Sequence, residues 1–277
     1  MPMPNILRSL LEFVAPRHCA VCGKRLMADE KVLCIACLLD LHISEYANGK
    51  EGNTLERTFW QRLPIVRAAA FITYDRNNSQ RSIVLDLKYH NHPGIGLHIG
   101  QLMSKQLKDN SFFDGVDMII PVPIPTGKHL RRGYNQSEKL AQGISKATGI
   151  PINMRAIMRR PYKTSQTHLT AAERQENVKD SFRLRRGSIG TLRGKHLLIV
   201  DDVITTGATV QECGRVLCQI PGISISVLSL AVSSNLIRNI RRANPVQDNN
   251  QMPPDTNQMP PNTNQVPPNT LDKHETA

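Results

Sequence analysis

The fold of this chain is decided by residues 197–210, which read Leu197-Leu-Ile-Val-Asp201-Asp202-Val-Ile-Thr205-Thr206-Gly207-Ala208-Thr209-Val210. The four leading apolar residues predict a buried β-strand that delivers two adjacent carboxylates at its end. A turn rich in hydroxyl groups follows and opens a predicted helix from about Thr209 to Gln219. The backbone amides of such a turn, its hydroxyl groups and the helix N-terminus can together hold a phosphate group.

The two carboxylates need a different ligand, because they repel phosphate. Asp201 and Asp202 can each accept a hydrogen bond from one of the two vicinal hydroxyl groups of a ribose. A phosphate on one side and a diol on the other describe a ribose 5-phosphate.

Two other interpretations of this stretch are weaker. A strand end that only caps a helix also uses Asp or Thr, but two adjacent acids and three threonines exceed what capping requires. A P-loop ATPase has acids after an apolar strand, yet it also requires the pattern GxxxxGK followed by Ser or Thr. The nearest segment, Gly190-Thr-Leu-Arg-Gly194-Lys195-His196, has the wrong spacing and lacks the hydroxyl group.

Apolar strand-like runs and helical segments alternate on both sides of this stretch. Strands are predicted at 67–74, 117–124, 152–158, 195–200 and 223–232. Helices are predicted at 82–89, 137–147 and 209–219, and one more follows the turn at 89–96 and ends at about residue 108. This alternation predicts an α/β fold with a doubly wound, mostly parallel sheet, whose ligands bind at the carboxyl ends of the strands.

Four of the six cysteines form two pairs near the start of the chain, Cys19-Ala-Val-Cys22 and Cys34-Ile-Ala-Cys37. Two such pairs supply four thiolates for tetrahedral zinc, and a segment this small needs the metal for its folding energy. A redox pair or a disulfide is the competing interpretation. The spacing favours a structural zinc site.

The net charge of +12 is concentrated in one block. Residues 126–196 contain 16 basic and 4 acidic residues. Such a block favours a polyanionic partner, phosphate or nucleic acid, over an ordinary solvated face.

Four regions are predicted along the chain. They are an N-terminal helix with the four-cysteine segment (1–43), a linker and helical hood (44–110), the α/β core (111–243), and a tail of Pro-rich seven-residue repeats expected to be disordered (244–277). No run reaches the roughly 18 uncharged apolar residues of a membrane helix, and the N-terminus does not read as a signal peptide. A cytoplasmic location is therefore expected.

These motifs together carry a family resemblance. Residues 197–210 resemble the phosphoribosyl pyrophosphate signature of type I phosphoribosyltransferases. With the four cysteines and several further motifs, the chain resembles the ComF family of competence-associated proteins from about residue 5 to 235. The further motifs are Pro121-Val-Pro, Arg132-Gly-Tyr-Asn-Gln136, Lys163-Thr-Ser-Gln166, Glu173-Arg174, Asn177-Val178 and Phe182.

The resemblance implies roles for particular residues. Asp201 and Asp202 would hold the ribose hydroxyls and serve as catalytic residues. Pyrophosphate, bridged to the ribose by Mg²⁺, would lie near the loop after Pro123, and residues 159–180 would form a closing loop with Lys163 and Arg174 as catalytic candidates. The 5-phosphate would bind at Thr205, Thr206, Gly207, Ala208 and Thr209, and the candidates for anion binding are Lys128, Arg131, Arg132 and Arg160.

Two functions are compatible with this resemblance. The first is a DNA-uptake protein of natural transformation that binds phosphoribosyl pyrophosphate and single-stranded DNA, alongside a competence helicase and recombination-mediator proteins. The second is an active phosphoribosyltransferase that transfers ribose 5-phosphate to an unidentified nucleobase or amine. The sequence leaves open whether transfer is catalysed.

Overall fold

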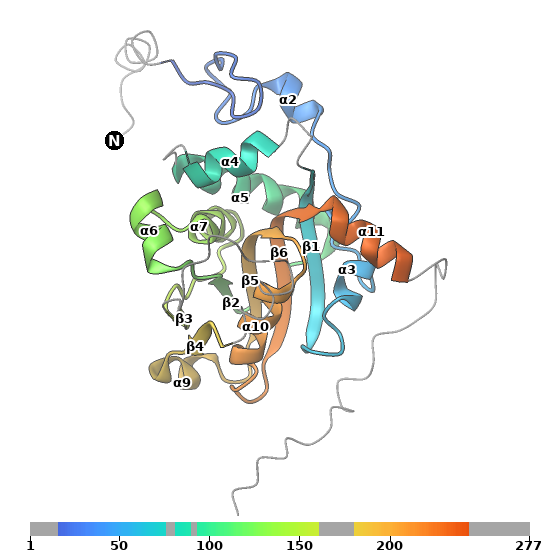
Figure 1. Ribbon diagram of the computed structural model, residues 1–277, viewed down its shortest axis with the longest axis vertical. Helices are drawn as coiled ribbons and strands as arrows, with labels where there is room; N and C mark the ends of the chain where they lie inside the picture. Colours follow the sequence, from blue (N-terminus) through green and yellow to red (C-terminus); the bar gives the residue numbers. More distant parts are fainter. Residues whose placement is uncertain (1–15, 76–80, 90–92, 161–179, 244–277) are drawn as a thin grey trace, which may run out of the picture.

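The computed structural model describes residues 16–75, 81–89, 93–160 and 180–243. Its centre is a four-stranded parallel sheet with the strand order β1-β6-β5-β2. These strands are β1 (Ile65–Tyr74), β2 (Met118–Pro121), β5 (His196–Ile204) and β6 (Ser224–Ser233). The predicted α/β fold with a mostly parallel sheet is confirmed (Figure 1).

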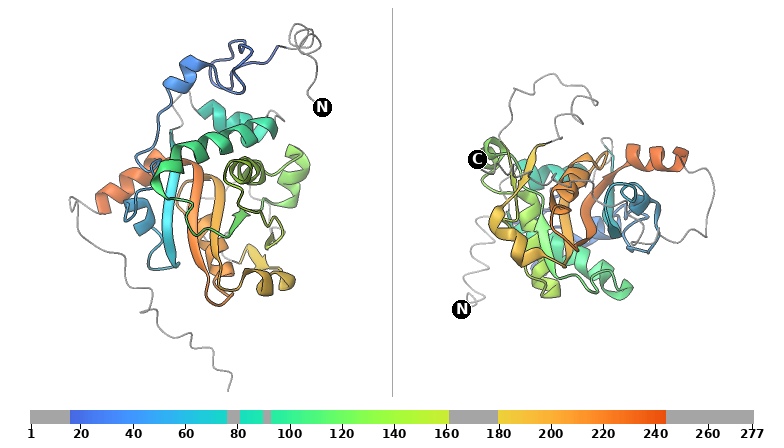
Figure 2. Two further views of the ribbon diagram at one scale, coloured as in Figure 1. Left: turned by 180° about the vertical axis from the view of Figure 1, so that it is seen from behind. Right: turned by 90° about the horizontal axis from the view of Figure 1, so that it is seen from below.

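Helices cover both faces of the sheet, as parallel sheets require. One face packs against α4 (Arg81–Tyr89), α5 (Pro93–Leu107) and α7 (Gln136–Thr148). The other packs against α3 (Thr54–Arg57), α9 (Ile189–Leu192), α10 (Ala208–Leu217) and α11 (Ser234–Ala243). The end-on view in Figure 2 shows this layering.

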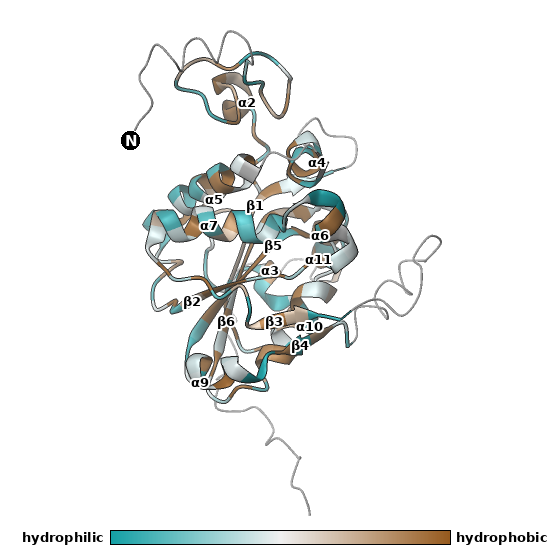
Figure 3. Cartoon of the chain, turned by 90° about the vertical axis from the view of Figure 1, so that its left-hand side faces the viewer, coloured by the Kyte–Doolittle hydropathy of each residue, from teal (hydrophilic) through white to brown (hydrophobic). Residues whose placement is uncertain are grey.

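Strand β5 shows why the sequence folds this way. Leu198 and Val200 point into one hydrophobic cluster, and Leu197 and Ile199 point into the other. Because alternate side chains of a strand face opposite sides, a continuous apolar run fills both interfaces at once. In Figure 3 the hydrophobic colouring is concentrated where the sheet lies between its helices.

Strand β1 belongs to the same sheet although it precedes the predicted core at 111–243. It pairs in parallel with β6, from Ile65 opposite Ile225 to Tyr74 opposite Ser233. The four predicted regional boundaries remain predictions, and the tail at 244–277 lies outside the described residues.

The predicted strand at 152–158 is wrong for most of its length. Ile152 makes an isolated bridge to Ile119, and the chain then turns at Asn153, whose side chain accepts the Arg155 amide at 3.0 Å. Such an Asx turn ends extended pairing. The strand that follows, β3 (Ile157–Arg159), pairs antiparallel with β4 (Phe182–Leu184), outside the main sheet.

Two smaller helices lie near the end of the sheet where its strands terminate. Helix α6 (Thr126–Arg132) follows β2, where the sequence predicted only a loop, and α2 (Ile35–Leu39) belongs to the four-cysteine segment. Figure 1 shows α4 and α6 at this end, with the four-cysteine segment beyond α4.

Candidate functional site

The two acids of residues 197–210 lie on strand β5 itself, which continues through them to Ile204. The side chain of Asp201 is buried, and its Oδ1 accepts the Asp202 amide at 2.9 Å. The Ser137 hydroxyl, at the start of α7, donates to the same oxygen at 3.4 Å. The sequence therefore fixes one carboxylate inside the fold and leaves its neighbour more open.

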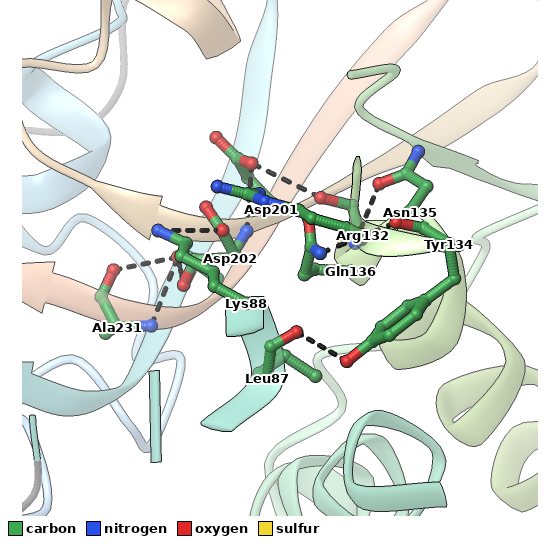
Figure 4. Close-up of polar contacts among 11 residues, drawn as sticks. Leu87, Lys88, Arg132, Tyr134, Asn135, Gln136, Asp201, Asp202 and Ala231 are labelled. Atoms are coloured by element: carbon green, nitrogen blue, oxygen red, sulfur yellow. Dashed lines mark hydrogen bonds and ion pairs between the residues drawn. The ribbon is translucent and has the colours of Figure 1, made fainter. Parts of the chain in front are cut away.

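The electrostatics of this acid pair involve a lysine from another element. Burial raises the pKa of the Asp201 carboxyl to about 7, and the charge of Asp202 adds to the increase. Lys88, near the end of α4, opposes it, because its ammonium group lies 3.0 Å from Oδ2 of Asp202. Figure 4 shows the lysine reaching across to the acids.

The turn after β5 brings two threonines to the N-terminus of helix α10. Thr205 and Thr206 are exposed, and the Ser233 hydroxyl holds the Thr205 carbonyl at 3.1 Å. Gly207 has a φ of +78° and is the N-cap of α10, and the Ala208 amide donates to the Thr206 hydroxyl oxygen at 3.4 Å. Free amides at a helix N-terminus favour a bound anion.

The start of α7 ties the neighbouring elements to this site. The Asn135 side chain donates to the Val122 carbonyl at 3.0 Å and accepts the Ser137 amide at 3.1 Å. Tyr134 donates its hydroxyl to the Leu87 carbonyl of α4 at 2.6 Å. The loop after β2, helix α7 and helix α4 are thereby held around Asp201.

The predicted anion-binding cations lie in different places. Lys128, Arg131 and Arg132 are on α6, where Arg131 is exposed and Arg132 donates to Oε1 of Gln136 at 2.8 Å. Arg160 follows β3 and is exposed. The catalytic candidates Lys163 and Arg174 lie outside the described residues.

The antiparallel β3–β4 pair and the segment after it carry a dense positive charge. Residues 155–160 and 181–195 contain no acidic residue. We call the exposed guanidinium groups of these two segments the arginine surface. Its members are Arg155, Arg160, Arg183, Arg185, Arg186 and Arg193.

The four cysteines of the N-terminal segment converge. The sulfur atoms of Cys19, Cys22, Cys34 and Cys37 all lie within 4.8 Å of one another. The amides of Val21 and Cys34 point at the Cys19 sulfur, at 3.5 and 3.3 Å, as expected where backbone donors stabilise thiolates. Four thiols at this separation fit a tetrahedral zinc ion.

Comparison with known proteins gives a clear family relationship. The chain is 31% identical over 216 residues to the DNA utilization protein YhgH of Escherichia coli O157:H7. The aligned region covers 76% of this chain and 88% of that protein. It is 38% identical over 116 residues to Competence protein F of Haemophilus influenzae, covering 42% of this chain and 50% of that protein. The chain belongs to the ComF family. No family model matches it.

Solved structures also resemble this ComF family chain. An adenine phosphoribosyltransferase from Leishmania donovani has a TM-score of 0.36 at 14% identity, covering 73% of this chain and 80% of that one. A glutamine phosphoribosylpyrophosphate amidotransferase from B. subtilis has a TM-score of 0.34 at 19% identity, covering 52% of this chain and 30% of that one. Among the helices of the described residues, none is long and apolar enough to cross a membrane.

Sequence reasoning missed two side chains at the site of this ComF protein. Ser137 directly follows the segment Arg132-Gly-Tyr-Asn-Gln136 and begins the predicted helix 137–147. The sequence could therefore have indicated its place at a helix start, next to a candidate site motif. Lys88 stands in an ordinary amphipathic helix far from residues 197–210. No local pattern marks it, because the contact depends on how α4 packs.

Proposed function

We propose that this chain acts in the use of DNA during natural transformation and binds phosphoribosyl pyrophosphate with Mg²⁺. The first part is supported by the relatives whose names are DNA utilization protein and Competence protein F. The second part rests on one observation. Asp201 and Asp202 lie near the carboxyl end of the buried strand β5, which ends at Ile204 before a hydroxyl-rich turn that opens helix α10.

The proposed binding mode divides the ligand among these groups. Asp201 and Asp202 accept the two ribose hydroxyls, each an O–H donor that an ionised carboxylate satisfies. Residues 205–209 hold the 5-phosphate through backbone amides and threonine hydroxyls. The magnesium pyrophosphate then faces α6, where Lys128, Arg131 and Arg132 supply positive charge.

The phosphate part of this mode is tested by removing hydroxyl groups. Thr205→Val with Thr206→Val deletes two candidate donors at exposed positions, and Thr191→Val is a control at an exposed threonine of α9. We expect the double variant to bind ribose 5-phosphate about tenfold more weakly or worse in calorimetric titration, and the control to bind normally. Equal binding by all three proteins would contradict the proposed phosphate cradle.

We further propose that single-stranded DNA binds across the arginine surface. In the antiparallel β3–β4 pair, Arg183 lies opposite Met158, on the face away from buried Ile157 and Phe182. Arg183 therefore points outward, and with the other exposed guanidinium groups it can contact a phosphate backbone without any base readout. Large exposed aromatic rings do not occur in these two segments, so the affinity should be electrostatic and strongly dependent on salt.

A charge-matched comparison tests this surface. One variant replaces Arg160, Arg183 and Arg185 by Gln, and the control replaces the exposed Arg238, Arg242 and Lys50 by Gln, so both lose three charges. We expect the first variant to lose most of its affinity for a labelled oligonucleotide and to show a shallower salt dependence. The surface would be wrongly assigned if both variants lost affinity equally.

An active phosphoribosyltransferase is the second candidate function. Its support is the intact set of Asp201, Asp202 and the turn. Catalysis of transfer and simple ligand binding both require this set. In transfer, the nucleophile would form a bond to the anomeric carbon as the carbon–oxygen bond to pyrophosphate breaks. A pyrophosphate-release screen over nucleobases and amines distinguishes the two, because binding without release favours the DNA-uptake role.

A further inference from the structure

The ion pair between Lys88 and Asp202 joins two elements that are far apart in sequence. Its Nζ–Oδ2 distance is 3.0 Å, and the two side chains are only 22% and 18% exposed. A contact so shielded from solvent is stronger than an ordinary surface ion pair. It is also placed on the carboxylate that, under the proposed function, receives one ribose hydroxyl.

The lysine is delivered to this position by an anchored helix. Ile83, Val84 and Leu87 of α4 are almost fully buried in the core. The Leu87 carbonyl accepts the Tyr134 hydroxyl at 2.6 Å, which connects α4 to the start of α7. Lys88, one residue further, is therefore held beside β5 by packing on one side and a hydrogen bond on the other.

The buried Asp201 carboxyl needs a positive neighbour to favour its charged form. Asp201 is buried next to Asp202, and two adjacent carboxylates in a shielded site oppose each other's ionisation. Groups near them include the Ser137 hydroxyl from α7, the buried Cys213 thiol from α10 and the Lys88 ammonium from α4, and the charge of Arg159 on β3 also acts on Cys213. The ammonium group is a cation in direct contact with Asp202, at 3.0 Å.

Ionisation matters because a ribose diol offers two O–H donors. A carboxylate accepts both without competition, whereas a protonated acid carries a donor of its own. The ammonium group occupies one oxygen of Asp202 and leaves the other oxygen as an acceptor. The ion pair and the diol contact can therefore coexist on the same side chain.

We propose that Lys88 is a positioning residue of the phosphoribosyl site, which holds the Asp202 carboxylate in place and keeps a positive charge beside the buried Asp201, so that both carboxylates accept the ribose hydroxyls. This inference rests on the proposed binding of phosphoribosyl pyrophosphate. It assigns helix α4 a direct part in ligand recognition.

The test compares ribose 5-phosphate binding by the full-length wild type, Lys88→Gln, Lys88→Arg and a control, Lys105→Gln, at an exposed lysine of α5. Titrations are run at about pH 7 and about pH 9, with folding checked by circular dichroism. We expect Lys88→Gln to bind about tenfold more weakly or worse at the lower pH, because a shielded charge loses its partner. At the higher pH the Asp201 carboxyl ionises without help from the ammonium group, so the loss should shrink to within about threefold.

The other variants make the result decisive. Lys88→Arg keeps the charge and should bind within about threefold of wild type at both pH values, and Lys105→Gln should match wild type. The inference is overturned if the wild type binds ribose 5-phosphate and Lys88→Gln binds it equally well. It is also overturned if Lys88→Gln shows the same loss of affinity at both pH values. The proposed function stands in either case. If Lys88→Gln does not fold, weak binding by a folded Lys88→Arg protein overturns it. Absence of binding by the wild type would overturn the proposed function itself.

Discussion

Gly207 faces the ring of Phe59 so closely that a Cβ atom on Gly207 would lie 3.0 Å from Cε1 of Phe59. Phe59 is fully buried, so its ring has little room to move aside. Gly207 also has a φ of +78°, which disfavours any side chain. The glycine of the turn after β5 is thus required both by its backbone angle and by its neighbour.

Gly207→Ala tests this double requirement. We expect it to lower the free energy of unfolding by about 2–4 kcal/mol, from left-handed strain and overpacking together. Gly194→Ala is the matched control, because Gly194 has a φ of +68° and nothing within 4 Å of its Cβ position. It should cost only about 1–2 kcal/mol. If the urea midpoint falls by the same amount in Gly207→Ala and Gly194→Ala, the Phe59 contact contributes nothing to the destabilisation.

The buried Asp201 carboxyl should make stability depend on pH. Its folded-state pKa of about 7 lies above the ordinary value of 3.8, because of burial and the charge of Asp202. The folded state therefore keeps a proton that the unfolded state loses, and this contribution to stability is present below about pH 4 and is lost as the pH rises through about 7. Asp201→Asn removes the titration. In urea unfolding from about pH 5 to 8, the stability of the variant relative to wild type should rise with pH; a constant difference would contradict the assignment.

Helices α5 and α7 cross at a pair of glycines. A Cβ atom on Gly143 would lie 2.9 Å from the Cα of Gly100 and would overlap the Leu97 carbonyl oxygen. Gly143→Ala should therefore force the helices apart and destabilise the protein by about 1–3 kcal/mol or more. Gly94→Ala, in α5 with open space around its Cβ position, should be neutral or slightly stabilising. Thermal unfolding of both variants checks the contrast, which would vanish if the crossing could relax.

The four-cysteine cluster should hold one zinc ion per chain. Cys34→Ser removes a buried ligand and should abolish zinc binding and lower the melting temperature. Cys218→Ser, at an exposed cysteine outside the cluster, should retain the metal. Elemental analysis of the purified proteins measures the zinc content. A wild-type protein whose melting temperature does not change on metal removal would contradict a structural role.

The sheet could be predicted because its information is local. The apolar run before Asp201 and the helical pattern at 137–147 each specify one element through short-range patterns, and both elements form where expected. The segment 152–158 misled the prediction, because its apolar residues satisfy a strand pattern while the Asn153 side chain turns the chain.

The site was predictable only in part, for a related physical reason. Asp201, Asp202 and the turn are contiguous, so a single stretch reveals them. Lys88 reaches Asp202 only through the packing of α4, which depends on contacts such as the Tyr134–Leu87 hydrogen bond. A contact between residues more than a hundred positions apart leaves no trace in either local pattern.

The central claim is that the acid pair and the adjoining turn bind a phosphoribosyl group. Calorimetric titration of magnesium phosphoribosyl pyrophosphate into wild type and into Asp201→Asn with Asp202→Asn tests it most directly. The account predicts saturable binding by wild type and a loss of about 100-fold or more in the double variant, since each hydrogen bond to a charged acceptor contributes about 1.5–3 kcal/mol. Undetectable binding by wild type, or equal binding by a folded double variant, would contradict it.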